Sequence, residues 1–149
     1  MADKQLFPVF EAPEVLQETT TETQKFKRSY YFDYETGDFA KDGGNRVRQA
    51  DGHTAWAQWC LKIVQIERYA CLAYSSDIGI EMEEVRKQPT RKAAEAVLER
   101  TITEALLVHP MTESVRGFSF QWDGDNLGTE FTVYPKEGVA ITINTSVTT

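Results

Sequence analysis

The sequence predicts an α+β fold in which two main helices pack on one face of a small antiparallel or mixed sheet, with extended N- and C-terminal arms. Two long stretches, residues 51–68 and 90–107, repeat apolar side chains every three or four positions, which is typical of amphipathic helices. Residues 115–133 alternate apolar and polar side chains around an Asp-Gly-Asp-Asn turn, which indicates a β-hairpin. Residues 139–149 carry no charged side chain and are rich in β-branched residues, which favours a further strand.

The length and the charge of the chain restrict its class. We expect one domain in 149 residues, divided into an extended N-terminal arm (1–25), an α+β domain (26–138) and a C-terminal β tail (139–149). The net charge of −7 without a basic stripe argues against a nucleic-acid partner. No apolar run suits a signal peptide or a membrane span, so we expect a protein made in a cytoplasm with no membrane partner.

Short strands and turns are expected before the first helix. Residues 26–34 alternate aromatic and polar side chains, which predicts one strand. Turn-forming residues follow at 35–38 and 41–45. Val47 is expected on a short edge strand, where the flanking Arg46 and Arg48 discourage further pairing.

Each predicted helix begins at a residue suited to capping its first turn. Asp51 is the expected N-cap of the first helix and Thr90 that of the second. We expect the first helix to continue to about Arg68, with Trp56 and Trp59 as core residues rather than a binding platform.

The segment between the helices, residues 66–81, sets a charged pair directly against aromatic and aliphatic residues. Charges in such surroundings have to be paired or hydrogen-bonded when they are buried, so we expect Glu67 and Arg68 not to be ordinary solvated residues. A helix C-terminus with a favourable arginine is the alternative. Cys60 and Cys71 both have apolar neighbours and are expected to be buried and reduced, with a disulfide between them left open.

The uncharged tail needs a partner strand. An unpaired strand of this composition is an aggregation hazard. Two arrangements remove the hazard: the tail pairs within its own sheet, or it pairs with another chain by β-augmentation. The composition of the tail leaves both open.

Local signatures of chemistry are missing from the sequence. His53 and His109 are isolated, and no CxxC, nucleophile elbow or glycine-rich phosphate loop is present, so we expect no metal and no cofactor. Several carboxylates lie between residues 67 and 84, and a glycosidase needs two carboxyl groups about 5 to 9.5 Å apart. A small peptidoglycan-cleaving hydrolase is therefore the alternative function, although no sugar-binding cleft is evident.

Short motifs follow one another in a recognisable order over residues 28–134. They are Tyr31-Phe32-Asp33-Tyr34-Glu35-Thr36-Gly37-Asp38-Phe39, Ile66-Glu67-Arg68-Tyr69 with Tyr74-Ser75 and Gly79-Ile80-Glu81, Ile102-Thr103-Glu104-Ala105-Leu106-Leu107, Val115 with Phe118-Ser119-Phe120, and Phe131-Thr132-Val133. In this order they resemble the baseplate wedge proteins of contractile phage tails, the sheath-initiator family. Within that family they are most similar to the XkdS-like branch, related to wedge proteins called lysozyme-like.

The resemblance implies a structural, non-enzymatic protein of the virion, located in the tail baseplate after synthesis in the host cytoplasm. Members of the family occur in six copies around the tail tube, dock on neighbouring baseplate wedge proteins and start the sheath by pairing strands with the tail sheath subunit. The tail tube or hub is a further candidate partner. Under this resemblance, Glu67 and Arg68 form an internal ion pair that fixes the geometry between helix and loop.

The resemblance also implies two sets of interaction residues. Many relatives carry Glu-Pro-Arg where this chain has His109-Pro110-Met111, so an ionic docking contact is lost and contact through the proline remains. The candidate docking residues are Tyr74, Gly79, His109, Pro110 and Met111. The candidate residues for pairing with the sheath strand are Val139, Ile141, Ile143, Thr145 and Val147.

Overall fold

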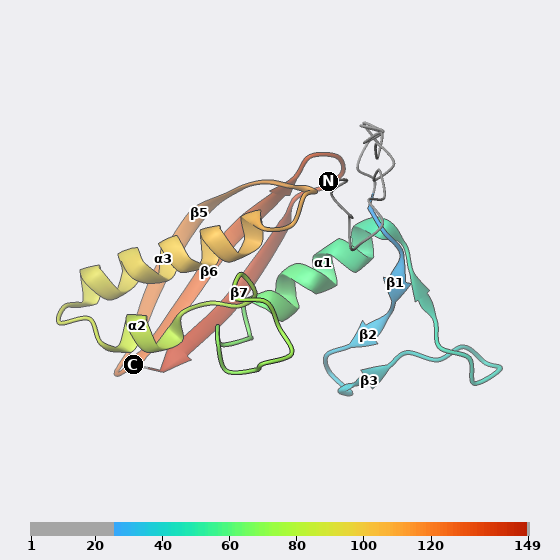
Figure 1. Ribbon diagram of the computed structural model, residues 1–149, viewed down its shortest axis with the longest axis horizontal. Coiled ribbons are helices and arrows are strands. Elements are labelled where there is room, and N and C mark those ends of the chain that lie inside the picture. The colour runs from blue at the N-terminus through green and yellow to red at the C-terminus, as the bar shows by residue number, and fades with distance from the viewer. Residues whose placement is uncertain (1–25, 149) are drawn as a thin grey trace, which may run out of the picture.

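The computed structural model describes residues 26–148, so the arm predicted over residues 1–25 lies outside the described part of the chain. The elements in chain order are β1 (Ser29–Tyr30), β2 (Phe32–Asp33), β3 (Asp38–Phe39), β4 (Gln49–Ala50), α1 (Gly52–Ile63), α2 (Met82–Arg86), α3 (Arg91–Leu107), β5 (Thr112–Asp123), β6 (Asn126–Pro135) and β7 (Ile141–Thr148). Figure 1 shows α1 and α3 on one face of the sheet formed by β5, β6 and β7. The predicted α+β fold is confirmed.

The main sheet is antiparallel, with β6 between β5 and β7. A tight turn joins β5 to β6, where Gly124 has a φ of +61°, a conformation that glycine adopts without strain. β7 pairs with β6 from one end to the other with no shift of register. Of the two arrangements open to the tail, pairing within its own sheet is the one that the structure shows.

The core lies between this sheet and the helices. Odd-numbered residues of β6 and β7, such as Phe131 and Ile143, are buried against residues of the helices, such as Trp56 and Leu98. Even-numbered residues of β7 are exposed on the other face. An antiparallel sheet covered on one face produces this alternation, and it fixes the register because a slip of one residue would expose the apolar set.

A bulge at Gly117 lets β5 keep apolar residues on the covered face. The register with β6 shifts between Arg116 and Ser119, and Gly117 has a φ of +73°. Val115 before the shift and Phe118 after it both pack against the core, although they are three residues apart. One inserted residue reverses the alternation along the strand, which the sequence pattern alone does not reveal.

Both predicted N-caps are confirmed. The Asp51 carboxylate accepts a hydrogen bond from the backbone N–H of Thr54 at 2.7 Å. Hydrogen bonding to the side chain of Thr54, together with this backbone bond, lowers the pKa of Asp51. The hydroxyl of Thr90 accepts one from the N–H of Ala93 at 3.2 Å. These bonds satisfy donors that the first helical turn leaves unpaired.

The first helix ends at Ile63, earlier than its apolar pattern predicts. Beyond it, the backbone pairs with a distant segment instead of continuing the helix. The N–H of Ile80 donates to the carbonyl of Ile66, and the N–H of Arg68 donates to the carbonyl of Ile80, both at 2.9 Å. These tertiary hydrogen bonds replace the helical ones, which explains the error in the predicted boundary.

Residues 26–34 do not form one strand. β1 pairs with β4, while β2 pairs with β3, and the Asp33 carboxylate accepts from the N–H of Glu35 in a turn that ends β2. Figure 1 shows these short strands set apart from the main sheet, beside the start of α1. The side-chain amide of Gln58 donates to the carbonyl of Phe32, and the hydroxyl of Tyr34 donates to the carbonyl of Gln58. These two bonds hold the short strands to α1.

Candidate functional site

The outer edge of β7 has no strand beside it. Within residues 26–148, β7 pairs with β6 alone, so main-chain groups along its other side lack a strand partner. Its eight residues include no charged side chain and no bulge. Proteins usually protect an exposed edge with charges, prolines or bulges. An unprotected edge of this length is suited to the addition of an extended segment from another chain.

The opposite edge of the sheet, β5, is protected. Glu113, Arg116 and Asp123 lie along it, and two register shifts interrupt its pairing with β6. The indole N–H of Trp122 near the end of β5 donates to the carboxylate of Glu95 on α3 at 2.7 Å. Charges and bulges both oppose strand addition, so of these two edges β7 is the one suited to receive a strand.

Both ends of β7 are anchored to helices. The Nε2 atom of His53 on α1 lies 2.8 Å from the carbonyl oxygen of Val139, just before the strand. The Nε atom of Arg86, at the end of α2, donates to the carbonyl of Thr148 at 3.0 Å. A strand fixed at both ends loses little conformational entropy when a partner binds, which favours association.

Residues 66–80 form a loop whose two ends are joined, which we call the clamped loop. The hydrogen bonds between Ile66, Arg68 and Ile80 close it. Gly79 has a φ of +96°, and a Cβ at this position would lie 2.7 Å from the carbonyl oxygen of Ile66. Glycine is required where the two chain segments approach this closely. A compact loop closed in this way is an Ω-loop, a type that is frequently functional.

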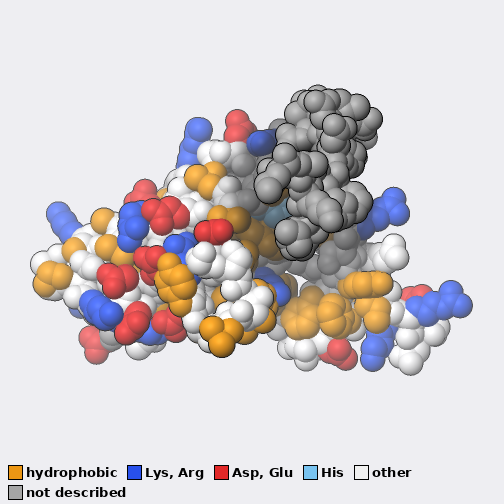
Figure 2. All heavy atoms as spheres, in the orientation of Figure 1, with side chains coloured by type: hydrophobic (Ala, Val, Ile, Leu, Met, Phe, Trp, Pro, Cys, Tyr) orange, Lys and Arg blue, Asp and Glu red, His pale blue; other side chains and the backbone are white. Residues whose placement is uncertain are grey.

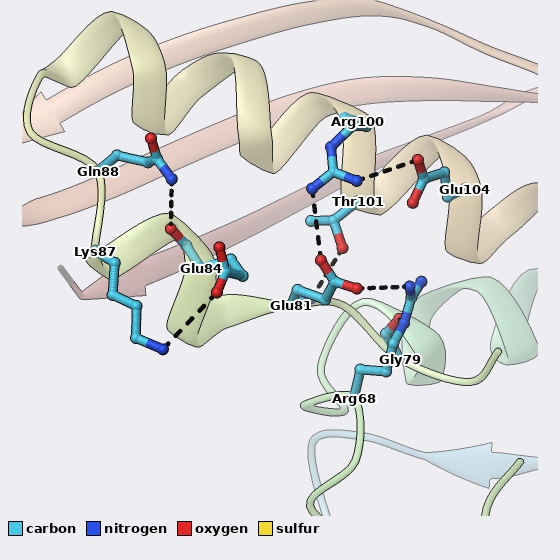
Figure 3. A network of polar contacts seen from close by, with 9 residues as sticks. All are labelled: Arg68, Gly79, Glu81, Glu84, Lys87, Gln88, Arg100, Thr101 and Glu104. Carbon is cyan, nitrogen blue, oxygen red and sulfur yellow. Dashed lines mark hydrogen bonds and ion pairs between the residues drawn. The ribbon is translucent and has the colours of Figure 1, made fainter. Parts of the chain in front are cut away.

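A network of charged hydrogen bonds fixes the base of the clamped loop (Figure 3). Arg68 donates from Nη1 to the Glu81 carboxylate at 3.0 Å and from Nε to the carbonyl of Gly79 at 3.1 Å. The other oxygen of Glu81 lies 3.5 Å from Arg100 of α3, and the N–H of Glu81 donates to the hydroxyl of Thr101 at 2.8 Å. The Arg68 and Glu81 side chains are only 10% and 20% exposed, where ionic hydrogen bonds are strong.

The expected pair between Glu67 and Arg68 is wrong. Glu67 lies 3.7 Å from Arg86, whereas Arg68 binds Glu81. Glu67 forms an isolated bridge with Ile80, and successive residues of an extended segment point to opposite sides. The two neighbouring charges therefore meet partners on different parts of the chain.

The tip of the clamped loop exposes apolar side chains. Tyr69 is 69% exposed, Leu72 is fully exposed and Tyr74 is 40% exposed. Tyr69 also has a φ of +69°, which is uncommon for a bulky residue and occurs where the surrounding structure dictates the backbone. Figure 2 shows hydrophobic side chains on the surface where this loop lies, next to charged side chains of both signs. Such a surface is typical of a contact with another protein.

The two cysteines differ in environment. Cys60 is buried in the core as predicted, and burial raises the pKa of its thiol to about 12. Cys71 is exposed in the clamped loop, so its predicted burial is wrong. Both are free thiols. The apolar neighbours of Cys71 in the sequence are themselves exposed, which misled the prediction.

The predicted docking residues lie in different places. Tyr74 is at the surface of the clamped loop and Pro110 is exposed after α3, with the half-buried His109 beside it. Gly79 and Met111 are buried, so a docked partner does not reach them in this conformation. The sequence patterns did not single out Tyr69 and Leu72, the most exposed large apolar residues of the clamped loop. Both lie in an apolar run that has neither helical nor strand periodicity. This lack of periodicity was the available signal that they belong to an exposed loop.

The predicted sheath-pairing residues lie on or beside β7. Ile143 and Val147 are buried in the core, while Ile141 and Thr145 are half-buried on the same face. Val139 is 74% exposed and precedes the strand. Because most of these side chains point toward the helices, a strand added to β7 would bind through main-chain groups.

A hollow of about 310 Å³ beside the base of the clamped loop gathers several carboxylates. It is lined by Glu67, Arg68, Tyr69, Glu81, Glu83 and Glu84. Both oxygens of Glu81 are engaged by arginines, which does not favour a role as a proton donor. In the described part of the chain, no His, Cys, Asp and Glu side chains gather into a group suited to hold a metal ion.

One protein-family model matches the chain, that of the contractile injection system sheath initiators, over residues 28–138. The chain belongs to this family. The match includes the short strands β1 to β4, the helices α1, α2 and α3, β5, β6 and the clamped loop, and it ends before β7 begins. No curated protein that was compared with the chain matches it.

Membership gives this sheath initiator a structural role in the assembly of a contractile tail sheath and an interaction with sheath and baseplate components. The family match does not support the hydrolase alternative. The XkdS-like branch stays a prediction. No helix within residues 26–148 has the length and apolar character needed to cross a membrane.

Proposed function

We propose that this sheath initiator starts the sheath by accepting a strand of the tail sheath subunit on the outer edge of β7. The observation that carries the proposal is the difference between the two edges of the sheet. β5 is bulged and charged, whereas β7 is straight, uncharged and open. The added strand would extend the order β5-β6-β7 by one member, with main-chain hydrogen bonds supplying affinity.

The clamped loop is the proposed docking surface for neighbouring wedge proteins of the baseplate. Its tip presents Tyr69, Leu72 and Tyr74, and the bonds between Arg68, Gly79 and Glu81 hold it in shape. Large aromatic and aliphatic side chains on a preorganised surface are typical anchors of protein interfaces. Pro110 offers a second contact, and six copies in the baseplate with contacts to the tail tube or hub belong to the same proposal.

Docking and sheath pairing would use different parts of the molecule. Arg86 lies between them, because it contacts both Glu67 at the base of the clamped loop and the carbonyl of Thr148 at the end of β7. A protein that joins a baseplate to a sheath needs two such surfaces on one rigid body.

The test is binding of the tail sheath subunit encoded with this protein. Asn144→Lys with Ser146→Lys places two charges on the exposed face of β7 without touching the core. Lysine on an edge strand opposes strand addition, so we expect capture of the sheath subunit to be lost. Ser119→Lys with Gln121→Lys makes the same change on the exposed face of β5 and is expected to bind normally. Thermal melting checks that both variants fold.

Amide hydrogen exchange supplies a second readout that needs no substitution. In the free protein, the outward N–H groups of β7 exchange quickly, and we expect the sheath subunit to slow them while β5 is unchanged. Slowed exchange in β5 with unchanged β7 would overturn the proposal and move the sheath contact to the other edge.

A further inference from the structure

The open edge of β7 has two chemically different sides. On the side facing away from the helices, β7 exposes Thr142, Asn144 and Ser146. On the helix side, Ile143 is buried but Ile141 is only half-buried. A strand added beside β7 would place side chains on both the outer side and the helix side, because neighbouring strands of a sheet align their alternating side chains.

Helix α1 supplies an apolar surface on the helix side of this edge. Its central stripe, which includes Trp56 and Cys60, is buried against the sheet. Ala57 and Leu61 lie one turn apart on one flank of the stripe, and both are only partly buried. We call these two residues the α1 flank. Leu61 is partly exposed although it is a large aliphatic residue in the middle of the fold.

Contacts at either side of α1 show which way this flank faces. His53, one turn before Ala57 on the same flank, lies 2.8 Å from the carbonyl oxygen of Val139 at the start of β7. Trp59 is on the other flank, and its ring lies 4.7 Å from that of His109, which follows α3. The α1 flank therefore faces away from α3. Figure 1 shows α1 on the side of the sheet where β7 lies.

We propose that the strand accepted by β7 is an uncharged strand of the sheath subunit with apolar residues at every second position, which face the α1 flank. This inference rests on the proposed function and adds the side-chain pattern of the partner. Its apolar residues would cover Ala57, Leu61 and the exposed part of Ile141. Small polar residues would alternate with them, beside Thr142, Asn144 and Ser146.

The alternating pattern of the added strand follows from the side chains that are favourable on each side of the β7 edge. A charged residue on the helix side would be placed against Leu61 and Ile141, where it loses water without gaining an ionic partner from β7. An apolar residue on the outer side would stay exposed to water beside polar neighbours and gain nothing. A strand with a different period cannot meet both requirements, since its apolar residues would fall on both faces.

Two carrier proteins with the same strand composition test the pattern. One ends in eight residues that alternate Val and Thr, and the other ends in the same four Val and four Thr arranged in pairs. With the full-length sheath initiator immobilised, we expect the alternating carrier to bind about tenfold more tightly, since only it buries all its apolar side chains. Leu61→Ser should remove most of this difference. Leu107→Ser, which deletes an exposed leucine at the end of α3, should leave it unchanged.

Equal binding of the two carriers, or an equal difference in the Leu61→Ser variant, would overturn the inference even if the sheath subunit still protects the amides of β7. If the alternating carrier binds more tightly but the sheath subunit does not slow amide exchange in β7, the side-chain pattern is supported. The sheath subunit is then rejected as the protein that supplies the strand. Protection of β7 by a second copy of this chain alone would replace the sheath subunit with self-association and overturn the inference. Melting temperatures of the variants must match the unmodified protein.

Discussion

Arg68 and Glu81 form the ion pair that closes the clamped loop, with 3.0 Å between Nη1 and the carboxylate oxygen. The same guanidinium donates to the carbonyl of Gly79, so one side chain joins both ends of the loop. Because this pair is largely buried, removal of Arg68 leaves the Glu81 carboxylate with the more distant and exposed Arg100, at 3.5 Å, as its ionic partner.

Arg68→Ala is therefore expected to lower the free energy of unfolding by about 3 kcal/mol, measured by urea denaturation. Arg100→Ala is the matched control, because Arg100 also contacts Glu81 but is 52% exposed. The exposed contact should contribute less than about 1 kcal/mol. Equal losses in the two variants would show that burial does not distinguish the two arginines.

Gly79→Ala should disrupt the clamped loop. The added Cβ would lie 2.7 Å from the carbonyl oxygen of Ile66, and the positive φ of this residue disfavours any side chain. We expect a loss of at least about 2 kcal/mol in unfolding free energy together with reduced docking on wedge proteins. Gly124→Ala is the control, because Gly124 also has a positive φ but open space around its Cβ position. A milder effect at Gly79 than at Gly124 would contradict the close approach.

The two thiols should react at very different rates. Cys71 is exposed, whereas Cys60 is buried with a pKa raised to about 12, so it stays protonated at neutral pH. We expect a thiol reagent at pH 7.5 to label one cysteine rapidly and the second only after unfolding. Cys71→Ser should abolish the rapid phase, and rapid labelling that persists in this variant would place Cys60 at the surface.

Stability should depend on the protonation of His109. Its Nδ1 atom accepts a hydrogen bond from the N–H of Met111, and partial burial lowers the pKa of His109 below the ordinary histidine value of 6.5. The folded state thus favours the neutral ring, and the stability that this provides is complete above pH 6.5 and is lost as the pH falls toward the folded-state pKa. His109→Asn keeps an acceptor but does not titrate.

Melting temperatures between pH 7.5 and 5 check this prediction. The unmodified protein should lose more stability over this range than the His109→Asn variant. The same decline in both proteins would assign the pH dependence to other groups.

The elements that the sequence predicted well are those whose pattern is local. Asp51 and Thr90 mark helix starts by their capping chemistry, and the alternation around Gly124 marks the hairpin. Errors arose where distant residues decide the outcome. The end of α1 depends on hydrogen bonds from Ile80, and no periodicity near Ile66 records them.

The candidate site was predicted only in part. The uncharged tail drew attention to β7, but its composition fits an internal strand and a shared strand equally well, so only the fold placed it at an edge. Glu67 and Arg68 were expected to pair with each other, but their partners, Arg86 and Glu81, come from a segment more than ten residues away. Tyr69 and Leu72 at the loop tip lie in an apolar run without helical or strand periodicity, and this lack of a pattern was the available hint of their exposure.

The contrast between β5 and β7 makes the two edges of the sheet unequal. A strand can join it from one side, and the bulges of β5 end any extension in the other direction. Under the proposed function, such a molecule would stand at one end of a strand-linked polymer and would not insert into the middle of it. The two unequal edges of the sheet would then set where growth begins and in which direction it proceeds.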